Sequence, residues 1–167
     1  PVTIREFGAR IMFRDLREET LQFGPVRLDT MLLRHPGYCL GYRLNCRGRS
    51  ICYVTDNELY LPSDPRHDAR YVERLAEFAR GADVLITDTT YRDHEYPSKV
   101  DWGHSCVSQV ADLAARAEVQ RLHLFHHDPD QTDADIDAKL DEAREELVRL
   151  GSKVVCEAPA EGSELVF

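Results

Sequence analysis

An α/β fold in which helices cover the outer face of a mixed sheet is predicted by three features of this chain. Up to about residue 55 the sequence is a series of strand-like runs separated by turn residues. After about residue 65 the hydrophobic period becomes helical. A short apolar run then follows each predicted helix, and such alternation is typical of a sheet with helices packed on it.

The first half is predicted to be an antiparallel meander. Apolar and polar residues alternate after Val26, and turns such as Phe23-Gly24-Pro25 and Cys46-Arg47-Gly48 separate the runs. The predicted strands are Ala9–Phe13, Thr20–Phe23, Val26–Leu33, Cys39–Leu44 and Ser50–Val54.

The second half is predicted to alternate helix and strand. Apolar spacing indicates helices over 71–79, 107–117 and 136–150; Gly81 and Gly151 end the first and third, and Thr132 is a candidate N-cap. The predicted strands are Asp83–Ile86, Arg121–Phe125 and Lys153–Cys156.

Composition indicates one globular domain over residues 1–167, since 43% of the residues are hydrophobic and 31% are charged. The net charge of −9 argues against a protein that binds nucleic acid or anionic membrane through a general basic surface, and it is compatible with a small anionic substrate held by metal.

The sequence has no apolar run of about 20 residues and no signal-like segment, which predicts a cytoplasmic protein. Its five cysteines form no C-x-x-C pair and are predicted to be mostly buried free thiols.

Candidate metal ligands follow three predicted strands. His35, Asp56 and His126 each stand just beyond a strand end. If the strands align, these ends meet at one edge of the sheet. Imidazole and carboxylate ligands suit zinc, manganese or iron, and the two oxygens of Asp56 can bridge two ions.

Two further residues are candidates for catalysis. Asp88 follows the strand ending at Ile86, and His104 precedes the second helix, where it can donate a proton or contact an anion. His127 points elsewhere if the backbone is extended, so it is expected to support or line the site. Each residue alone also fits a structural role, and the prediction depends on their joint occurrence.

Five motifs in order strengthen the prediction: His35–Arg43, Cys52–Asp56, Ala82–Asp88, Gly103–Ser105 and Leu124–Pro129. Together they resemble the C-terminal half of the metallo-β-lactamase αββα sandwich. The likeness is greatest to the branch that contains ribonuclease Z and related phosphodiesterases, and it extends over about residues 26–150.

The resemblance implies a metal-dependent hydrolase that cleaves phosphodiesters with a metal-bound hydroxide. It implies that His35, Asp56 and His126 bind two divalent ions, most commonly zinc, with manganese or iron as alternatives. It also implies that His104 and Asp88 lie beside the scissile phosphate, where the histidine protonates the leaving oxygen.

The sequence departs from the family in two places. It contains no upstream His-x-His-x-Asp-His cluster, so we expect an upstream half of a longer polypeptide to complete the site. Thr87 replaces a histidine often found in the ribonuclease Z branch, which argues against tRNA processing in particular.

Two other functions remain open at this point. One is a metal-free binding or regulatory module that keeps the fold without catalysis. The other is an unrelated α/β enzyme that uses His104 and Asp88 as an acid–base pair without metal. The sequence also leaves open the substrate, the metal and the oligomeric state, a homo-oligomer included.

Overall fold

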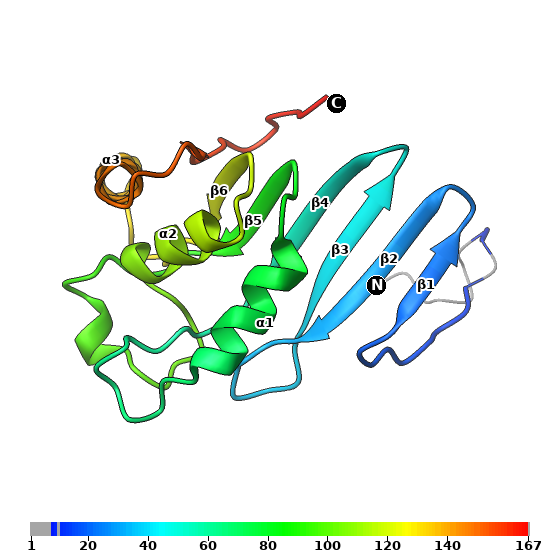
Figure 1. Ribbon diagram of the computed structural model, residues 1–167, viewed down its shortest axis with the longest axis horizontal. Helices are drawn as coiled ribbons and strands as arrows, with labels where there is room; N and C mark the ends of the chain where they lie inside the picture. The colour runs from blue at the N-terminus through cyan, green and yellow to red at the C-terminus, as the bar shows by residue number, and fades with distance from the viewer. Residues whose placement is uncertain (1–7, 10, 167) are drawn as a thin grey trace.

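A seven-stranded sheet whose strands lie side by side in chain order forms the centre of the molecule (Figure 1). The computed structural model describes residues 8–9 and 11–166. The first four strands pair antiparallel, and β4 to β7 pair parallel. The strands are β1 (Thr20–Phe23), β2 (Val26–Leu32), β3 (Leu40–Cys46), β4 (Arg49–Val54), β5 (Val84–Asp88), β6 (Arg121–Phe125) and β7 (Val155–Glu157). The mixed α/β sheet is therefore confirmed.

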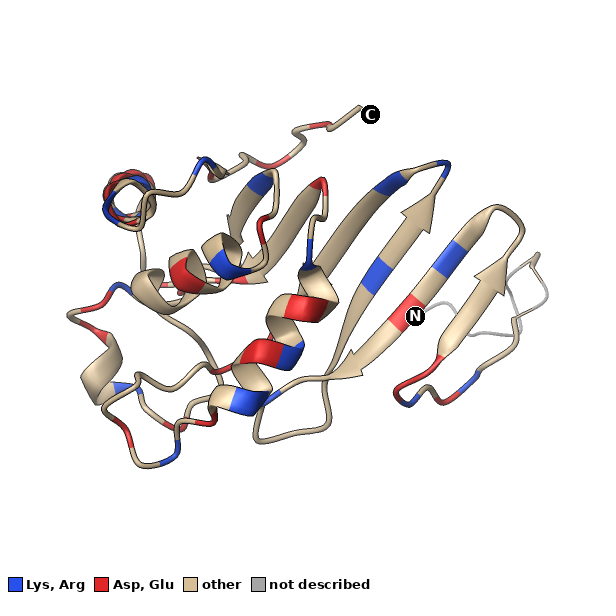
Figure 2. Cartoon of the chain, in the orientation of Figure 1, with Lys and Arg blue, Asp and Glu red and all other residues tan. Residues whose placement is uncertain are grey.

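Three α-helices connect the parallel strands and cover one face of the sheet (Figure 1). They are α1 (Ala69–Ala79), α2 (Val107–Arg116) and α3 (Asp133–Arg149), and a short 3₁₀ helix, η2 (Tyr96–Ser98), precedes α2. Figure 2 shows charged residues along the helices, whereas the strands of the parallel half carry few. The helices thus shield the sheet from solvent with a charged outer surface.

Side-chain caps set where two of these helices begin. The Asp68 carboxylate accepts hydrogen bonds from the backbone N–H groups of Arg70 and Tyr71. The hydroxyl of Thr132, the predicted N-cap, accepts from the backbone N–H of Asp135. Both caps satisfy backbone donors that the first helical turn leaves without partners.

The core lies between the sheet and the helices. Cys52 and Val54 of β4, Leu85 of β5, and Leu122 and Leu124 of β6 are fully or almost fully buried there. Alternate residues of the same strands face the other side of the sheet, since the side chains of a strand alternate between its faces. Several members of this second set are less buried, among them Ile51, Tyr53, Ile86 and Phe125, whereas Val84 of β5 is fully buried.

The predicted strand Ala9–Phe13 was wrong for the residues that the structure describes there. Residues 11–13 belong to no strand, and Met12 and Phe13 are 79% and 82% exposed. A strand needs a hydrogen-bonded neighbour, and residues 11–13 pair with no strand in the part of the chain that the structure describes, so local composition alone was misleading. The third helix begins at Asp133, three residues earlier than predicted, directly after its cap.

The five cysteines are free thiols, as predicted, and Cys52, Cys106 and Cys156 are buried. Among the described residues, no helix has the length and apolar character needed to cross a membrane.

The topology brings four strand ends to one edge of the sheet. β2 and β4 run in the same direction because each is antiparallel to β3, and β5 and β6 are parallel to β4. The segments that follow these strands, which contain the predicted site residues, therefore begin at the same edge.

Candidate functional site

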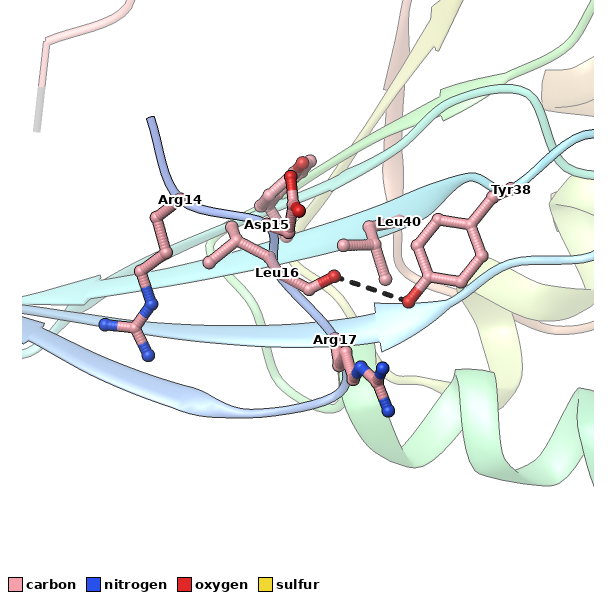
Figure 3. A pocket seen from close by; sticks show the side chains of 7 residues that line it. Arg14, Asp15, Leu16, Arg17, Tyr38 and Leu40 are labelled. Carbon is pink, nitrogen blue, oxygen red and sulfur yellow. Dashed lines mark hydrogen bonds between the residues drawn. The ribbon is translucent and has the colours of Figure 1, made fainter. Parts of the chain in front are cut away.

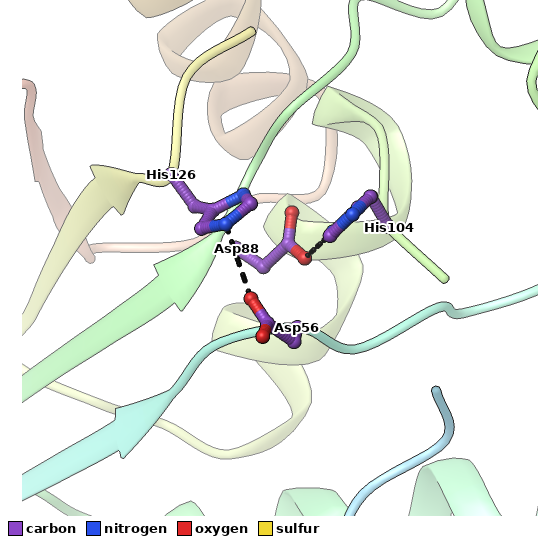
Figure 4. Close-up of side chains that lie close together, drawn as sticks. All are labelled: Asp56, Asp88, His104 and His126. Carbon is purple, nitrogen blue, oxygen red and sulfur yellow. Dashed lines mark hydrogen bonds and ion pairs between the residues drawn. The ribbon is translucent and has the colours of Figure 1, made fainter. Parts of the chain in front are cut away.

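Four side chains converge at this edge: Asp56, Asp88, His104 and His126 (Figure 4). Each offers one ligand atom, and these atoms all lie within 4.8 Å of one another. Asp88 ends β5, Asp56 and His126 follow β4 and β6, and His104 comes from the loop before α2. The convergence was expected, because ligands in such folds gather at the carboxyl ends of the parallel strands.

Asp56 and His126 face each other directly. The Nε2 atom of His126 lies 3.1 Å from Oδ1 of Asp56. Both residues have left-handed backbone conformations, with φ of 52° for Asp56 and 57° for His126. Non-glycine residues seldom adopt this conformation, and it bends the chain sharply where each strand ends. These bends bring the two side chains together.

Asp88 is fully buried and holds His104 in place. Its Oδ2 atom lies 2.6 Å from Nδ1 of His104 and also accepts a hydrogen bond of 3.1 Å from the backbone N–H of Asn57. The hydrogen bond with Asp88 is the main reason that the pKa of His104 is raised, although partial burial opposes the shift. Asp88 therefore favours the protonated form of His104, which is the form that a proton donor needs.

A second buried carboxylate holds the loop that carries His104. The side chain of Glu58 accepts hydrogen bonds from the backbone N–H groups of Asp101 and Gly103, both at 2.9 Å, and from the Tyr96 hydroxyl at 2.8 Å. Charge-assisted bonds of this kind are among the strongest in proteins. Glu58 thus holds the backbone of the loop, whereas Asp88 holds the side chain of His104.

His35 lies beside the cluster. Its ring centroid is 5.6 Å from that of His104. Its Nδ1 atom accepts a hydrogen bond of 3.1 Å from the backbone N–H of Gly37. His35 is not among the four residues whose ligand atoms gather together. Its role as a metal ligand stays a prediction.

His127 points away from the four-residue cluster, toward α3. Its Nδ1 atom lies 3.2 Å from Nζ of Lys139, and burial together with this cation lowers the pKa of His127 to about 4. His127 therefore lies outside the cluster, as expected, although the reason differs: the backbone at His126 is left-handed and not extended.

Sequence reasoning missed three buried polar residues around the site: Glu58, Thr90 and Lys139. Lys139 left a visible signal, because it shares a helical stripe with Ile136, Leu140 and Ala143. A lysine on an apolar stripe indicates a buried cation with a specific partner. Glu58 and Thr90 left no such signal, since their partners lie in other segments.

The donor set fits a divalent metal ion. Two carboxylates and two imidazoles are the ligand types that zinc, manganese and iron accept. Zinc holds such ligands at about 2.0–2.2 Å, which places neighbouring ligand atoms roughly 3–3.5 Å apart. The 3.1 Å between His126 Nε2 and Asp56 Oδ1 matches that separation.

A separate hollow of about 620 Å³ lies between the segment 14–17 and Tyr38, near the His35 loop (Figure 3). The Tyr38 hydroxyl donates a hydrogen bond of 3.4 Å to the carbonyl of Leu16. None of the residues that line this hollow belongs to the four-residue cluster.

Comparison with known proteins gives a consistent result. A family model described as a beta-lactamase superfamily domain matches residues 2–127. Ribonuclease Z of Thermoplasma acidophilum is 44% identical over 80 residues, which are 48% of this chain and 25% of that protein. Ribonuclease Z of Thermoplasma volcanium is 40% identical over 101 residues, which are 60% of this chain and 29% of that protein. The chain thus spans well under half the length of either relative.

A solved structure shares the fold. The metallo-beta-lactamase fold protein YhfI from Bacillus subtilis matches 84% of this chain and 50% of its own, with a TM-score of 0.60. The two sequences are 17% identical, so this likeness concerns the fold alone.

Proposed function

This chain belongs to the beta-lactamase superfamily, and from that premise we propose that it is the C-terminal portion of a metal-dependent phosphodiester hydrolase. The observation that carries the proposal is the convergence of Asp56, Asp88, His104 and His126 at one edge of the sheet. The similarity to two ribonucleases Z, enzymes whose name refers to RNA, supports a phosphodiester as the bond that is cleaved.

We infer that the 167 residues are one domain portion that an upstream half completes. Three observations support this inference. The chain spans 25% and 29% of the two relatives compared above. The sequence contains no His-x-His-x-Asp-His cluster. The face of the sheet opposite the helices carries a groove of about 810 Å³ lined by side chains of β4, β5 and β6 on one side and by the C-terminal segment 157–165 on the other, and a second layer would cover the rest of this face.

His35, Asp56 and His126 are the residues that would hold two divalent ions, with zinc as the expected metal. A bound divalent ion lowers the pKa of water and polarises a phosphoryl oxygen, which is the chemistry that hydrolysis needs. The upstream cluster would add the remaining ligands.

The other two residues of the cluster, His104 and Asp88, would supply the proton to the leaving group. His104, held by Asp88 with its Nδ1–H in a hydrogen bond, presents the opposite side of its ring for donating a proton to the leaving oxygen.

The substrate would be a small anionic molecule or a phosphodiester, because the net charge of −9 opposes binding of nucleic acid through a general basic surface. A cytoplasmic location stays a prediction.

Removal of Asp56 tests the proposal. In the full-length protein, we expect Asp56→Ala to lose bound zinc and to lower hydrolysis of bis-p-nitrophenyl phosphate by more than the roughly 10–100-fold typical of outer-shell changes. Bound metal is measured by elemental analysis. Asp141→Ala is the matched control, because Asp141 is exposed on α3 and should change neither quantity.

Two outcomes would contradict the proposal. If the full-length protein, shown to contain the upstream cluster, held no metal and cleaved no phosphodiester, a metal-free module would be the better description. If activity persisted undiminished in strong chelator, His104 and Asp88 would instead act as an acid–base pair without metal.

A further inference from the structure

Thr90 lies between the two halves of the candidate site. Its hydroxyl is 2.7 Å from Oδ1 of Asp88 and 3.0 Å from Nδ1 of His126. It is also 2.8 Å from the backbone carbonyl oxygen of His126. Thr90 is only 4% exposed, so water does not compete freely for these contacts.

The hydroxyl has one proton, and the chemistry of its neighbours decides where that proton goes. An ionised carboxylate and a backbone carbonyl can only accept hydrogen bonds, whereas a neutral imidazole can either donate or accept. The hydroxyl proton therefore goes to an oxygen, and the shortest contact is the charge-assisted bond to Asp88. Toward His126, the Thr90 oxygen is then left as an acceptor.

We propose that Thr90 is a positioning residue that fixes the orientation of the His126 ring. Its hydroxyl donates to Asp88, and its oxygen meets Nδ1 of His126 as an acceptor, which turns Nε2 toward Asp56. Without a metal, the Asp56 carboxylate at 3.1 Å from Nε2 competes for the proton of the neutral ring, so Thr90 sets the orientation of the ring and not its tautomer. The use of that orientation in holding a metal rests on the proposed function.

The backbone of Thr90 is held firmly enough for this role. The buried ammonium group of Lys139 donates hydrogen bonds to the carbonyls of Thr89 at 2.7 Å and Thr90 at 2.9 Å. The side chain of Gln131 donates to the Thr90 carbonyl at 3.2 Å. The backbone N–H of Thr90 donates to Oδ1 of Asp88 at 3.1 Å. With both its N–H and its carbonyl engaged, Thr90 has little freedom to turn its hydroxyl away.

The contacts form one continuous chain across the site. It runs from His104 through Asp88 and Thr90 to His126, whose Nε2 faces Asp56. Asp88 therefore acts on both histidines, directly on His104 and through Thr90 on His126. Partners of this kind set the orientation of metal-binding histidines, and their loss typically costs about 10–100-fold in metal affinity.

A set of three variants in the full-length protein tests the proposal. Thr90→Val keeps the shape and removes the hydroxyl, and Thr90→Ser restores the hydroxyl. Thr89→Val is the matched control, because Thr89 is equally buried but its hydroxyl donates to the carbonyl of Thr87. Zinc affinity is measured by competition with a chelator. We expect a loss of about 10–100-fold for Thr90→Val and less than about threefold for the other two variants.

The orientation of the ring is read without zinc. In ¹H–¹³C correlation spectra of the zinc-free protein, the ring C–H signals of His126 are assigned by their absence in His126→Gln. These signals should be sharp in the wild-type protein and in Thr90→Ser, because the ring is held in one orientation. In Thr90→Val they should broaden or split, because the ring adopts more than one orientation.

Unchanged ring signals and unchanged zinc affinity in a folded Thr90→Val variant would overturn the proposal. Failure of the proposed function would give a different result. The wild-type protein would then bind no zinc, and the spectra would still decide whether Thr90 orients His126.

Discussion

Of the four side chains that converge at the site, Asp88 makes the most hydrogen bonds. Its two oxygens accept from the backbone N–H groups of Asn57 and Thr90, from the Thr90 hydroxyl and from His104. Burying a carboxylate is costly unless donors replace the lost water. Four donors meet that requirement. The fully buried carboxylate of Asp88 therefore holds the backbone of Asn57 and Thr90 and the side chains of Thr90 and His104 in place.

At the scale of single residues, Asp88→Asn should lower the pKa of His104. The hydrogen bond to the carboxylate is the largest cause of the raised pKa, and an amide of the same shape removes its charge. NMR titration of the His104 ring proton in metal-free protein measures the midpoint. Asp93→Asn is the control, because Asp93 contacts Ser108 instead.

The same change has a defined effect on stability. A raised pKa of His104 in the folded state means that its pairing stabilises the protein below about pH 6.5 and that this contribution disappears as the pH rises through the raised value. Asp88→Asn should make the free energy of unfolding depend less on pH between about pH 6.5 and the raised pKa of His104. An unchanged midpoint for His104 would contradict the assigned cause.

At the scale of elements, the loop before α2 depends on Gly103. This residue has φ of +92°, and a Cβ atom there would lie 2.4 Å from Cδ2 of His35 and 2.6 Å from Cδ of Pro36. Those distances are far below normal contact, and the neighbours belong to the segment that carries a predicted metal ligand. The glycine thus lets the His104 loop pack directly on the His35 loop.

Gly103→Ala should therefore be costly in a way that backbone strain alone does not explain. Gly81 also has a positive φ, of +62°, but a Cβ there meets nothing within 4 Å, so Gly81→Ala measures the strain by itself. We expect about 1–2 kcal/mol of destabilisation for Gly81→Ala and roughly 1–3 kcal/mol more for Gly103→Ala, measured by urea unfolding. Equal losses in the two variants would show that the close packing on His35 is unimportant.

Periodicity predicted the elements well where their signals are local. The strand Arg121–Phe125 has its predicted bounds, and Thr132 caps α3 as expected. The short helix Tyr96–Ser98 and the burial of Lys139 were not predicted. The helical stripe indicates that Lys139 is buried, but two of its acceptors, the carbonyls of Thr89 and Thr90, lie about fifty residues away, and no local pattern reveals them.

At the scale of the whole molecule, Lys139 links stability to pH. Burial is the main reason that its pKa is lowered to about 8, against about 10.4 in an unfolded chain. Between these values the unfolded state binds more protons than the folded state, so this residue makes stability rise with pH over that window. Below about pH 8 both states are charged, and its contribution is constant.

Lys139→Met should remove this rise. Buried cysteines with raised pKa values, such as Cys52, act in the opposite direction in the same window, so the comparison must be between variants. Relative to wild type, the slope of unfolding free energy between pH 8 and 10 should fall by up to about 1.4 kcal/mol per pH unit. Denaturant unfolding at several pH values measures it, with Lys153→Met, at an exposed position, as the control. Equal slopes of unfolding free energy against pH in the wild type and in Lys139→Met would show that Lys139 does not titrate in this range.

The sequence by itself determined the α/β class, the order of the elements, and the placement of His35, Asp56 and His126 just beyond strand ends and of Asp88 at one. Strand and helix periods, caps and turns depend on neighbours within a few residues, so these features can be read locally. Only the tertiary structure decided that Asp56, Asp88, His104 and His126 meet, and that Thr90, Glu58 and Lys139 hold them. Those contacts join residues that lie between 16 and 70 positions apart in the chain, so no local pattern predicts them. Burial strengthens each hydrogen bond, because no water replaces it.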